Sequence, residues 1–110
     1  MKQVFCKTTT KTQDHMNQTE AAYAQHLEIL RRAGQVIRYE YQPEKFRLAD
    51  RTFYTPDFRV VKPDGMVEFH EVKGFMRDDA AVKIKVAAEM HPYTFRLVRK
   101  VKKDWKIEEV

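Results

Sequence analysis

The feature that most constrains this 110-residue chain is "YTPDFRVVKPDGMVEFHEVKG" (54–74), which has the pattern of two strands joined by a tight turn. Valine and aromatic residues favour strands on both sides, and "KPDG" (62–65) has Pro and Gly at favoured turn positions. Acids and lysines are poor strand formers, yet Asp57, Glu71 and Lys73 lie in these predicted strands. Strand formation alone does not explain three charged residues there.

The turn predicts which residues face one another. If residues 63–65 form a type I turn followed by a left-handed glycine, Lys62 faces Met66. Continuing this register places Asp57 opposite Glu71, with Cβ atoms about 5 Å apart on one face. Lys73 lies two residues beyond Glu71 and therefore joins the same face. The loop thus predicts a cluster of two acids and a lysine.

Two opposed carboxylates destabilise a hairpin, and the cost rises when they are partly buried. A divalent cation removes that cost, because Mg²⁺ binds one or two carboxylates and keeps several waters. Asp57, Glu71 and the backbone carbonyl of Val72 therefore form a candidate metal-ligand set. Lys73 is then placed to orient a metal-bound water or to stabilise charge as the water attacks phosphorus. The alternative is that both acids lie on a solvated face and Lys73 is a simple ion-pair partner.

A helix is predicted over 17–34, and its first turn supplies another acid. Asn17 is a favourable N-cap, Glu20 follows three residues later as in a capping box, and Gly34 is a natural stop. Glu20 also lies within about 60° of the apolar stripe on a helical wheel, so it points toward whatever the helix packs on. If that is the sheet face bearing Asp57 and Glu71, a third carboxylate joins the cluster.

The other patterns complete a mixed α and β domain. Strands are expected over 35–43, 45–61 (two strands around a turn at 49–51), 66–75 and 93–101, a helix over 78–92, and a further edge strand within 102–110 as an open alternative. This order predicts a single domain over 1–110, of the α/β or α+β class, with a central mixed sheet of four to five strands flanked by helices. Residues 1–15 form a candidate N-terminal arm, within which "KTTTKT" (7–12) is expected to be either an arm or an edge strand.

Charge and composition favour an anionic partner. The net charge is +5 and the isoelectric point about 9.4, which favours nucleic acid, although the excess lysine can also serve solubility alone. No apolar run approaches the roughly 18 residues that span a bilayer, and the N-terminus lacks the apolar region of a signal peptide. With Cys6 as its single cysteine, the chain has no internal disulfide. These features predict a cytoplasmic location without membrane contact.

Two further residues, His70 and Trp105, are expected to have structural and not catalytic or binding roles. His70 neighbours Glu71 but points to the opposite face of its strand, which predicts a packed or exposed role rather than a catalytic one. Trp105 is expected to cover an edge of the fold in preference to stacking on a base.

The quoted motifs also resemble a known signature. "TPDF" followed by "EVKG" is similar to the PD-(D/E)XK nuclease motif, with Pro56-Asp57 and then Glu71-Val72-Lys73. A helix bearing an acid precedes the motif, and a basic helix and a strand follow it, so the resemblance spans roughly residues 17–99. Within that superfamily the chain most resembles an uncharacterised family of small phage-borne endonucleases.

The resemblance implies a restriction-endonuclease-like core that hydrolyses phosphodiesters with Mg²⁺ or Mn²⁺. It implies that Asp57, Glu71 and the Val72 carbonyl bind metal and that Lys73 positions or activates water. Glu20 corresponds to the helix acid that binds metal directly or through water in many members. Gln42, in "YQP", is expected to lie near the site without binding the metal itself.

The expected protein is therefore a Mg²⁺-dependent deoxyribonuclease of a bacterial host's cytoplasm, with branched DNA among its candidate substrates. A C2 homodimer is expected, because cutting two strands needs two sites. The residues expected to contact DNA are basic: Arg77, Lys83, Lys85, Arg99, Lys100, Lys102 and Lys103. The rival from another class is a non-catalytic nucleic-acid-binding or assembly protein with a vestigial site on the same fold.

Overall fold

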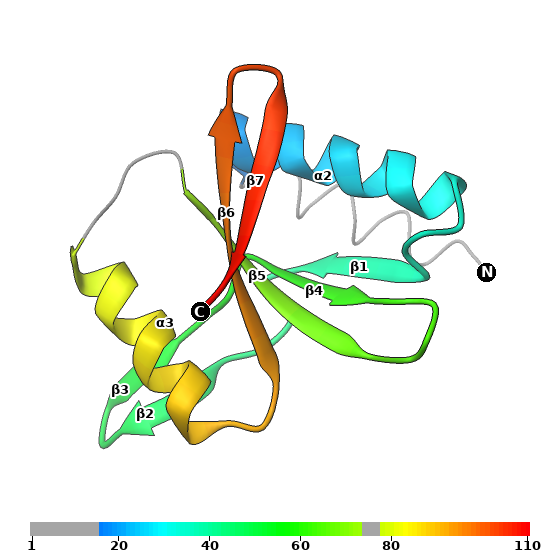
Figure 1. The fold of residues 1–110 in the computed structure, drawn as a ribbon. Helices are drawn as coiled ribbons and strands as arrows, with labels where there is room; N and C mark the ends of the chain where they lie inside the picture. Colours follow the sequence, from blue (N-terminus) through cyan, green and yellow to red (C-terminus); the bar gives the residue numbers. More distant parts are fainter. Residues whose placement is uncertain (1–15, 74–77) are drawn as a thin grey trace.

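Five strands form one mixed sheet in the order β1-β4-β5-β6-β7 (Figure 1). They are β1 (Arg38–Tyr41), β4 (Phe58–Val61), β5 (Val67–Lys73), β6 (Thr94–Val101) and β7 (Asp104–Glu109). The β5–β6 pair is parallel, and the other neighbours in this sheet are antiparallel. The structure, a computed structural model, describes residues 16–73 and 78–110. It confirms the expected α+β class with a five-stranded mixed sheet.

Helices cover both faces of the sheet. α2 (Gln18–Arg32) lies on one face, and α3 (Asp78–Met90) lies on the other beside a hairpin of β2 (Phe46–Ala49) and β3 (Thr52–Tyr54) (Figure 1). None of the helices in the described ranges is long and apolar enough to cross a membrane.

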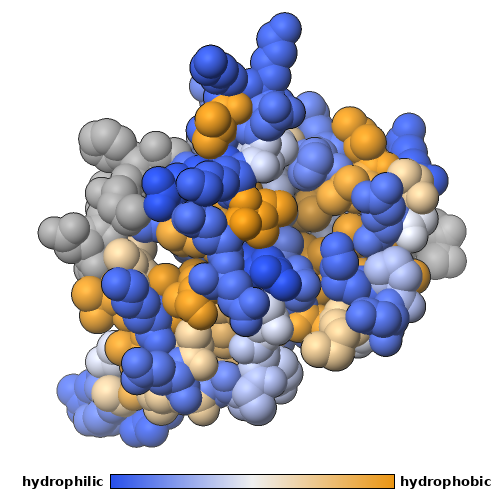
Figure 2. Space-filling model, viewed as in Figure 1, coloured by the Kyte–Doolittle hydropathy of each residue, from blue (hydrophilic) through white to orange (hydrophobic). Residues whose placement is uncertain are grey.

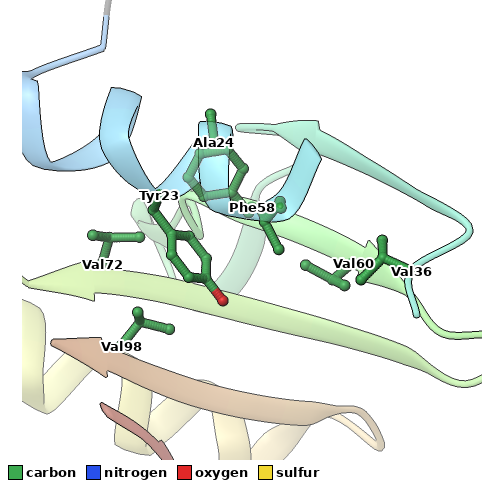
Figure 3. Packing of buried hydrophobic residues seen from close by; sticks show 8 residues of the cluster. Tyr23, Ala24, Val36, Phe58, Val60, Val72 and Val98 are labelled. Atoms are coloured by element: carbon green, nitrogen blue, oxygen red, sulfur yellow. The ribbon is translucent and has the colours of Figure 1, made fainter. Parts of the chain in front are cut away.

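Two apolar clusters fill the space between these layers. Beneath α2, Tyr23, Ala24 and Leu27 pack against Phe58, Val60, Val72 and Val98 of the sheet (Figure 3). On the α3 side, the cluster contains Phe46, Tyr54, Phe69, Ile84, Ala87 and Phe95. Strand β5 contributes Val72 to the first cluster and Phe69 to the second, because alternate side chains of a strand point to opposite faces. Glu68 and His70 therefore face α2, whereas Glu71 and Lys73 face the other way.

The start of α2 is the predicted capping box. Asn17 Oδ1 accepts the Glu20 N–H at 2.8 Å, and Glu20 Oε1 accepts the Asn17 N–H at 3.2 Å. The helix ends at Arg32, and Gly34 follows with φ +81°. That left-handed conformation suits glycine and stops the helix where the sequence predicts.

The hairpin of β4 and β5 has the predicted register. The Lys62 N–H donates to the Met66 carbonyl at 2.8 Å, and the Gly65 N–H donates to the Lys62 carbonyl at 2.9 Å. Gly65 has φ +89°, as the left-handed position of a three-residue loop requires. Phe58 pairs with His70 at the far end of the ladder. Continued by one residue beyond the ladder, this register sets Asp57, just before β4, opposite Glu71.

The segment 45–61 differs from the expectation of two strands. It forms three, because β2 and β3 make a separate two-stranded sheet and β4 begins only at Phe58. Pro56 has no N–H to donate to a ladder, so residues 55–57 interrupt the extended run. The β2–β3 hairpin packs against α3 instead of extending the main sheet.

The C-terminal residues form the edge strand that the sequence left open. Lys102 and Lys103 make the turn after β6, with Lys102 at φ +57°, and β7 returns along β6. The expected N-terminal arm (1–15) and Arg77 lie outside the described residues.

Candidate functional site

The two acids of the hairpin are not on a solvated face. Asp57, immediately before β4, is 7% exposed, and Lys73, at the end of β5, is 8% exposed. Glu71, two residues before Lys73 on the same strand, is half-buried. The alternative of a solvated ion-pair surface is therefore wrong for this region. The structure instead places two carboxyl groups and an ammonium group in a largely enclosed place.

Backbone groups hold Asp57 from two sides. Its Oδ2 accepts the Val72 N–H at 2.8 Å, and its carbonyl accepts the Gln42 N–H at 2.7 Å. Because the N–H and C=O of a strand residue point to the same neighbour, the Val72 carbonyl lies on the Asp57 side of β5. Gln42 adopts φ +46°, a left-handed conformation that is uncommon outside glycine. Gln42 thus lies beside the site, as expected, through its backbone.

Glu71 has a partner that the sequence did not predict. The Tyr54 hydroxyl, from β3, donates to Glu71 Oε1 at 2.7 Å. Burial first, and then the Glu71 charge, raise the pKa of Tyr54 well above its usual range. A partner for Tyr54 could have been expected on chemical grounds alone, because the hydroxyl of a buried tyrosine is normally hydrogen-bonded. What the sequence could not show is that the β2–β3 hairpin folds back to this place.

Glu20 reaches the site by a different route from the one expected. α2 packs on the β5 face that carries Val72, opposite to Glu71, so the condition of a shared sheet face is not met. Glu20 lies in the first turn of the helix, where its Oε1 accepts the Tyr41 hydroxyl at 2.8 Å. Its charge nevertheless raises the pKa of Asp57 and of Glu71. The three carboxyl groups therefore interact.

Both acids of the hairpin resist ionisation. Burial, and then the charge of Glu71, raise the pKa of Asp57 to about 8, and the hydrogen bond from Val72 only partly offsets this. Burial also raises the pKa of Glu71, while the hydrogen bond from Tyr54 and the charge of Lys73 act in the opposite direction. Without a divalent ion, the raised pKa of Asp57 favours the protonated form of that carboxyl group near neutral pH.

The donors suit a hard cation that keeps several waters. No group of three or more His, Cys, Asp or Glu side chains in residues 16–73 and 78–110 is arranged to hold a metal ion. Mg²⁺ requires only one or two carboxylates besides water and other oxygens. Asp57 and Glu71, destabilised as anions where they stand, fit that requirement.

Lys73 also lines a groove of about 670 Å³ between α3 and the β6–β7 hairpin. Lys85 and Arg99 line the same groove, together with acids that include Glu108. Arg99 is paired with Glu108 at 3.3 Å. Two of the seven basic residues expected to contact DNA therefore lie in one groove with Lys73.

The other basic residues do not gather there. The Lys100 ammonium lies 4.6 Å from the ring centroid of Trp105, which packs edge-on against Tyr23 on the α2 side. This packing agrees with Trp105 as an edge cover. Lys102 and Lys103 are exposed at the β6–β7 turn, and Lys83 on α3 is not among the groove residues. The expected basic cluster is thus divided between faces of the sheet.

His70 belongs to a separate buried network on the α2 side, as its predicted opposite orientation requires. Its Nδ1 lies 2.7 Å from the Tyr23 hydroxyl and its Nε2 lies 2.9 Å from Glu68 Oε1. Arg96 Nε completes the network at 3.0 Å from the same Glu68 oxygen. These four residues are balanced in charge and hydrogen bonding, which indicates a structural role.

Comparison with known proteins identifies a family. A family model described as "Protein of unknown function (DUF1064)" matches residues 2–109, nearly the whole chain and all of the candidate site. No curated protein and no solved structure matches the chain.

Proposed function

We propose that this chain, which belongs to the DUF1064 family, is a metal-dependent endonuclease that hydrolyses phosphodiester bonds in DNA. The proposal includes membership of the PD-(D/E)XK superfamily, near its small phage-borne endonucleases. One observation carries it: the buried Asp57 and the half-buried Glu71, both with raised pKa values, stand beside the buried Lys73 at the end of β5.

Two interacting carboxyl groups in an enclosed place lower the stability of the fold unless a bound cation offsets their charge. A fold gains nothing from two interacting acids that burial disfavours as anions. Clusters of perturbed acids beside a lysine are concentrated at functional sites. Of the three residues, Lys73 also lines the groove beside α3, which offers a substrate a way to its ammonium group.

The residues that would hold Mg²⁺ or Mn²⁺ are Asp57 and Glu71 through carboxylate oxygens and Val72 through its carbonyl. Glu20 would act through water, because its Oε1 already accepts hydrogen bonds from Tyr41 and Asn17. When bound, the ion supplies Lewis-acid stabilisation of a phosphoryl oxygen and lowers the pKa of a water.

The chain's own groups supply orientation and charge. The Lys73 ammonium donates hydrogen bonds that orient the attacking water or stabilise negative charge on the phosphoryl group. Tyr54 fixes Glu71 and the Val72 N–H fixes Asp57, so neither carboxylate has to be positioned when substrate binds.

The basic groove residues would bind the substrate backbone. Lys85 and Arg99 lie in the same groove as Lys73. Lysine and arginine contacts to phosphates give affinity without sequence choice. The proposal therefore expects weak sequence preference and makes DNA shape the variable to examine.

The test is a cleavage assay on supercoiled, linear, single-stranded and branched DNA with Mg²⁺, Mn²⁺ or EDTA. Cleavage should require a divalent ion and fall about 10³-fold or more in Asp57→Asn and Lys73→Ala. Lys45→Ala, at an exposed lysine just before β2 that is not among the expected DNA contacts, is the matched control and should cleave normally. Cleavage that survives both site substitutions, or that is absent on every substrate, contradicts the proposal. Metal-independent DNA binding without cleavage would identify the non-catalytic rival.

A further inference from the structure

The outer edge of β7 is the feature of the sheet that the proposed activity leaves unused. β7 is the last strand in the sheet order, and no strand of the described residues pairs with its outer side. An edge strand presents unpaired N–H and C=O groups that can pair with another chain.

The register shows which backbone groups face outward. The Val110 N–H donates to the Phe95 carbonyl at 2.9 Å, so this position points inward to β6. Directions alternate along an antiparallel strand. Lys106 and Glu108 therefore also bond inward, whereas Trp105, Ile107 and Glu109 point their backbone groups to the open edge.

The side chains along this edge suit a strand of the same sequence. Ile107 is 41% exposed, and it lies between Lys106 and Glu108, which have opposite charge. Figure 2 shows hydrophobic residues on this face only as separate patches among hydrophilic ones. The β7 edge is therefore a more suitable binding surface for a second copy than the separate apolar patches of that face.

We propose that β7 pairs antiparallel with β7 of a second copy, Ile107 facing Ile107 and Lys106 facing Glu108. The centre is an outward-facing position, so the edge groups of Trp105, Ile107 and Glu109 all gain partners. Each Lys106 then lies opposite a Glu108, and such opposite-charge cross-strand pairs are favourable.

Neighbouring registers are worse for a definite reason. Displacing the centre by one residue in either direction puts Lys106 opposite Lys106 or Glu108 opposite Glu108, and directly opposed like charges destabilise a pair. Such a shift would also centre the pairing on a residue whose backbone N–H and C=O point to β6. These groups are already hydrogen-bonded within the β6–β7 ladder and cannot bond to the partner. Charge and hydrogen bonding thus select the same register.

This pairing gives the candidate sites a fixed relation, a step that rests on the proposed function. Lys73 pairs with Arg99, and Arg99 pairs with Lys106, so the three share one row across the sheet. In the dimer this row continues across β7 and β6 of the second copy and ends on its β5, at Glu71 of the partner subunit. With a twofold axis perpendicular to the sheet, both sites lie on one face, about 24 Å apart along five strand spacings. One duplex can then contact both.

The test is sedimentation of the full chain at micromolar concentrations without DNA or divalent ions, so its result is independent of cleavage. The wild type should form dimers. Lys106→Glu and Glu108→Lys should each weaken the dimer about tenfold or more, because both cross-strand pairs become repulsive. An equimolar mixture of the two variants should form heterodimers, because every pair is again attractive. Lys103→Glu, outside the paired stretch, should leave the dimer unchanged.

A second variant protects the test against misfolding. Ile107→Pro removes an outward N–H and leaves the ladder to β6 intact, since edge strands tolerate proline at such positions. It should be monomeric with a circular dichroism spectrum like that of the wild type. A monomeric wild type, or dimers that none of these substitutions weakens, would overturn the proposal. Monomers whose Ile107 amide is protected from hydrogen exchange would show that another segment of the same chain covers the edge.

Discussion

Strand β5 carries two glutamates three residues apart that have opposite fates. Glu68 faces α2, where hydrogen bonds from His70 and then Arg96 lower its pKa to about 2, against an unfavourable contribution from burial. Glu71 faces the other side, where burial and the charge of Glu20 raise its pKa despite Tyr54 and Lys73. Both environments enclose a carboxylate, but only one of them supplies enough positive charge and hydrogen bonding.

The difference separates a structural acid from a functional candidate. The chain can build a balanced ion-pair network within one sheet, as Glu68, His70 and Arg96 show. At Asp57 and Glu71 it does not. An unbalanced acid pair beside a balanced one in the same strand indicates a requirement other than stability.

The largest expected effect is on cleavage, where the two glutamates should behave differently. Glu71→Gln is expected to lower the rate about 10³-fold, because it removes a charged metal-ligand candidate. Glu68→Gln, the matched change on the other face, should leave the rate per folded molecule unchanged. Single-turnover cleavage of one labelled DNA with Mg²⁺ measures both. Equal losses in the two variants would contradict the division between faces.

The same two substitutions should change stability in opposite directions. Glu68→Gln leaves Arg96 without its main anionic partner and should lower the free energy of unfolding by about 2 kcal/mol. Glu71→Gln removes an anion that burial disfavours while keeping an oxygen for Tyr54, and should raise it by about 1 kcal/mol. Urea unfolding at neutral pH without divalent ions tests this. Destabilisation of similar size in both variants would remove the distinction.

The free energy of unfolding should also depend on pH because of the acid pair. The pKa of Asp57 is raised from 3.8 to about 8, so between these values the folded state holds a proton that the unfolded state has released. That contribution to stability is complete below pH 3.8 and is lost as the pH rises through 8. Asp57→Asn should abolish this decline, and the difference in melting temperature between the variant and the wild type isolates it from other titrating groups.

Magnesium sharpens the same measurement. Because a divalent ion favours the ionised carboxylate, added Mg²⁺ should raise the melting temperature of the wild type more at pH 8 than at pH 5. Asp57→Asn should respond weakly at both. A response of the wild type that is independent of pH would argue against ion binding at this pair.

Local chemistry was enough to predict the hairpin and the helix start. A loop of residues 63–65 with a left-handed Gly65 allows one register, and that register brings Asp57 and Glu71 to matching positions. Asn17 and Glu20 likewise define a capping box within three residues. Both predictions rest on neighbours in the sequence, where turn and capping rules apply directly.

Contacts between distant segments were not readable in the same way. Tyr54 meets Glu71 only because β2 and β3 leave the main sheet, and α2 settles on the face opposite to Glu71 because its apolar stripe packs on Phe58 and Val72. No local rule fixes either choice. The sequence does not decide whether 102–110 form a strand, because the charged residues there are poor strand formers. Pairing with β6 overrides that preference.

The short loop between β4 and β5 also has a consequence in time. A hairpin of this kind closes within about 1–10 microseconds, whereas β6 reaches β5 only after the intervening helix has crossed the sheet. We therefore expect Asp57 and Glu71 to meet early, while water still surrounds them and their repulsion is small. Their repulsion grows only as later elements exclude solvent, so the covering of the two acids, and not their meeting, is the step of folding that they oppose.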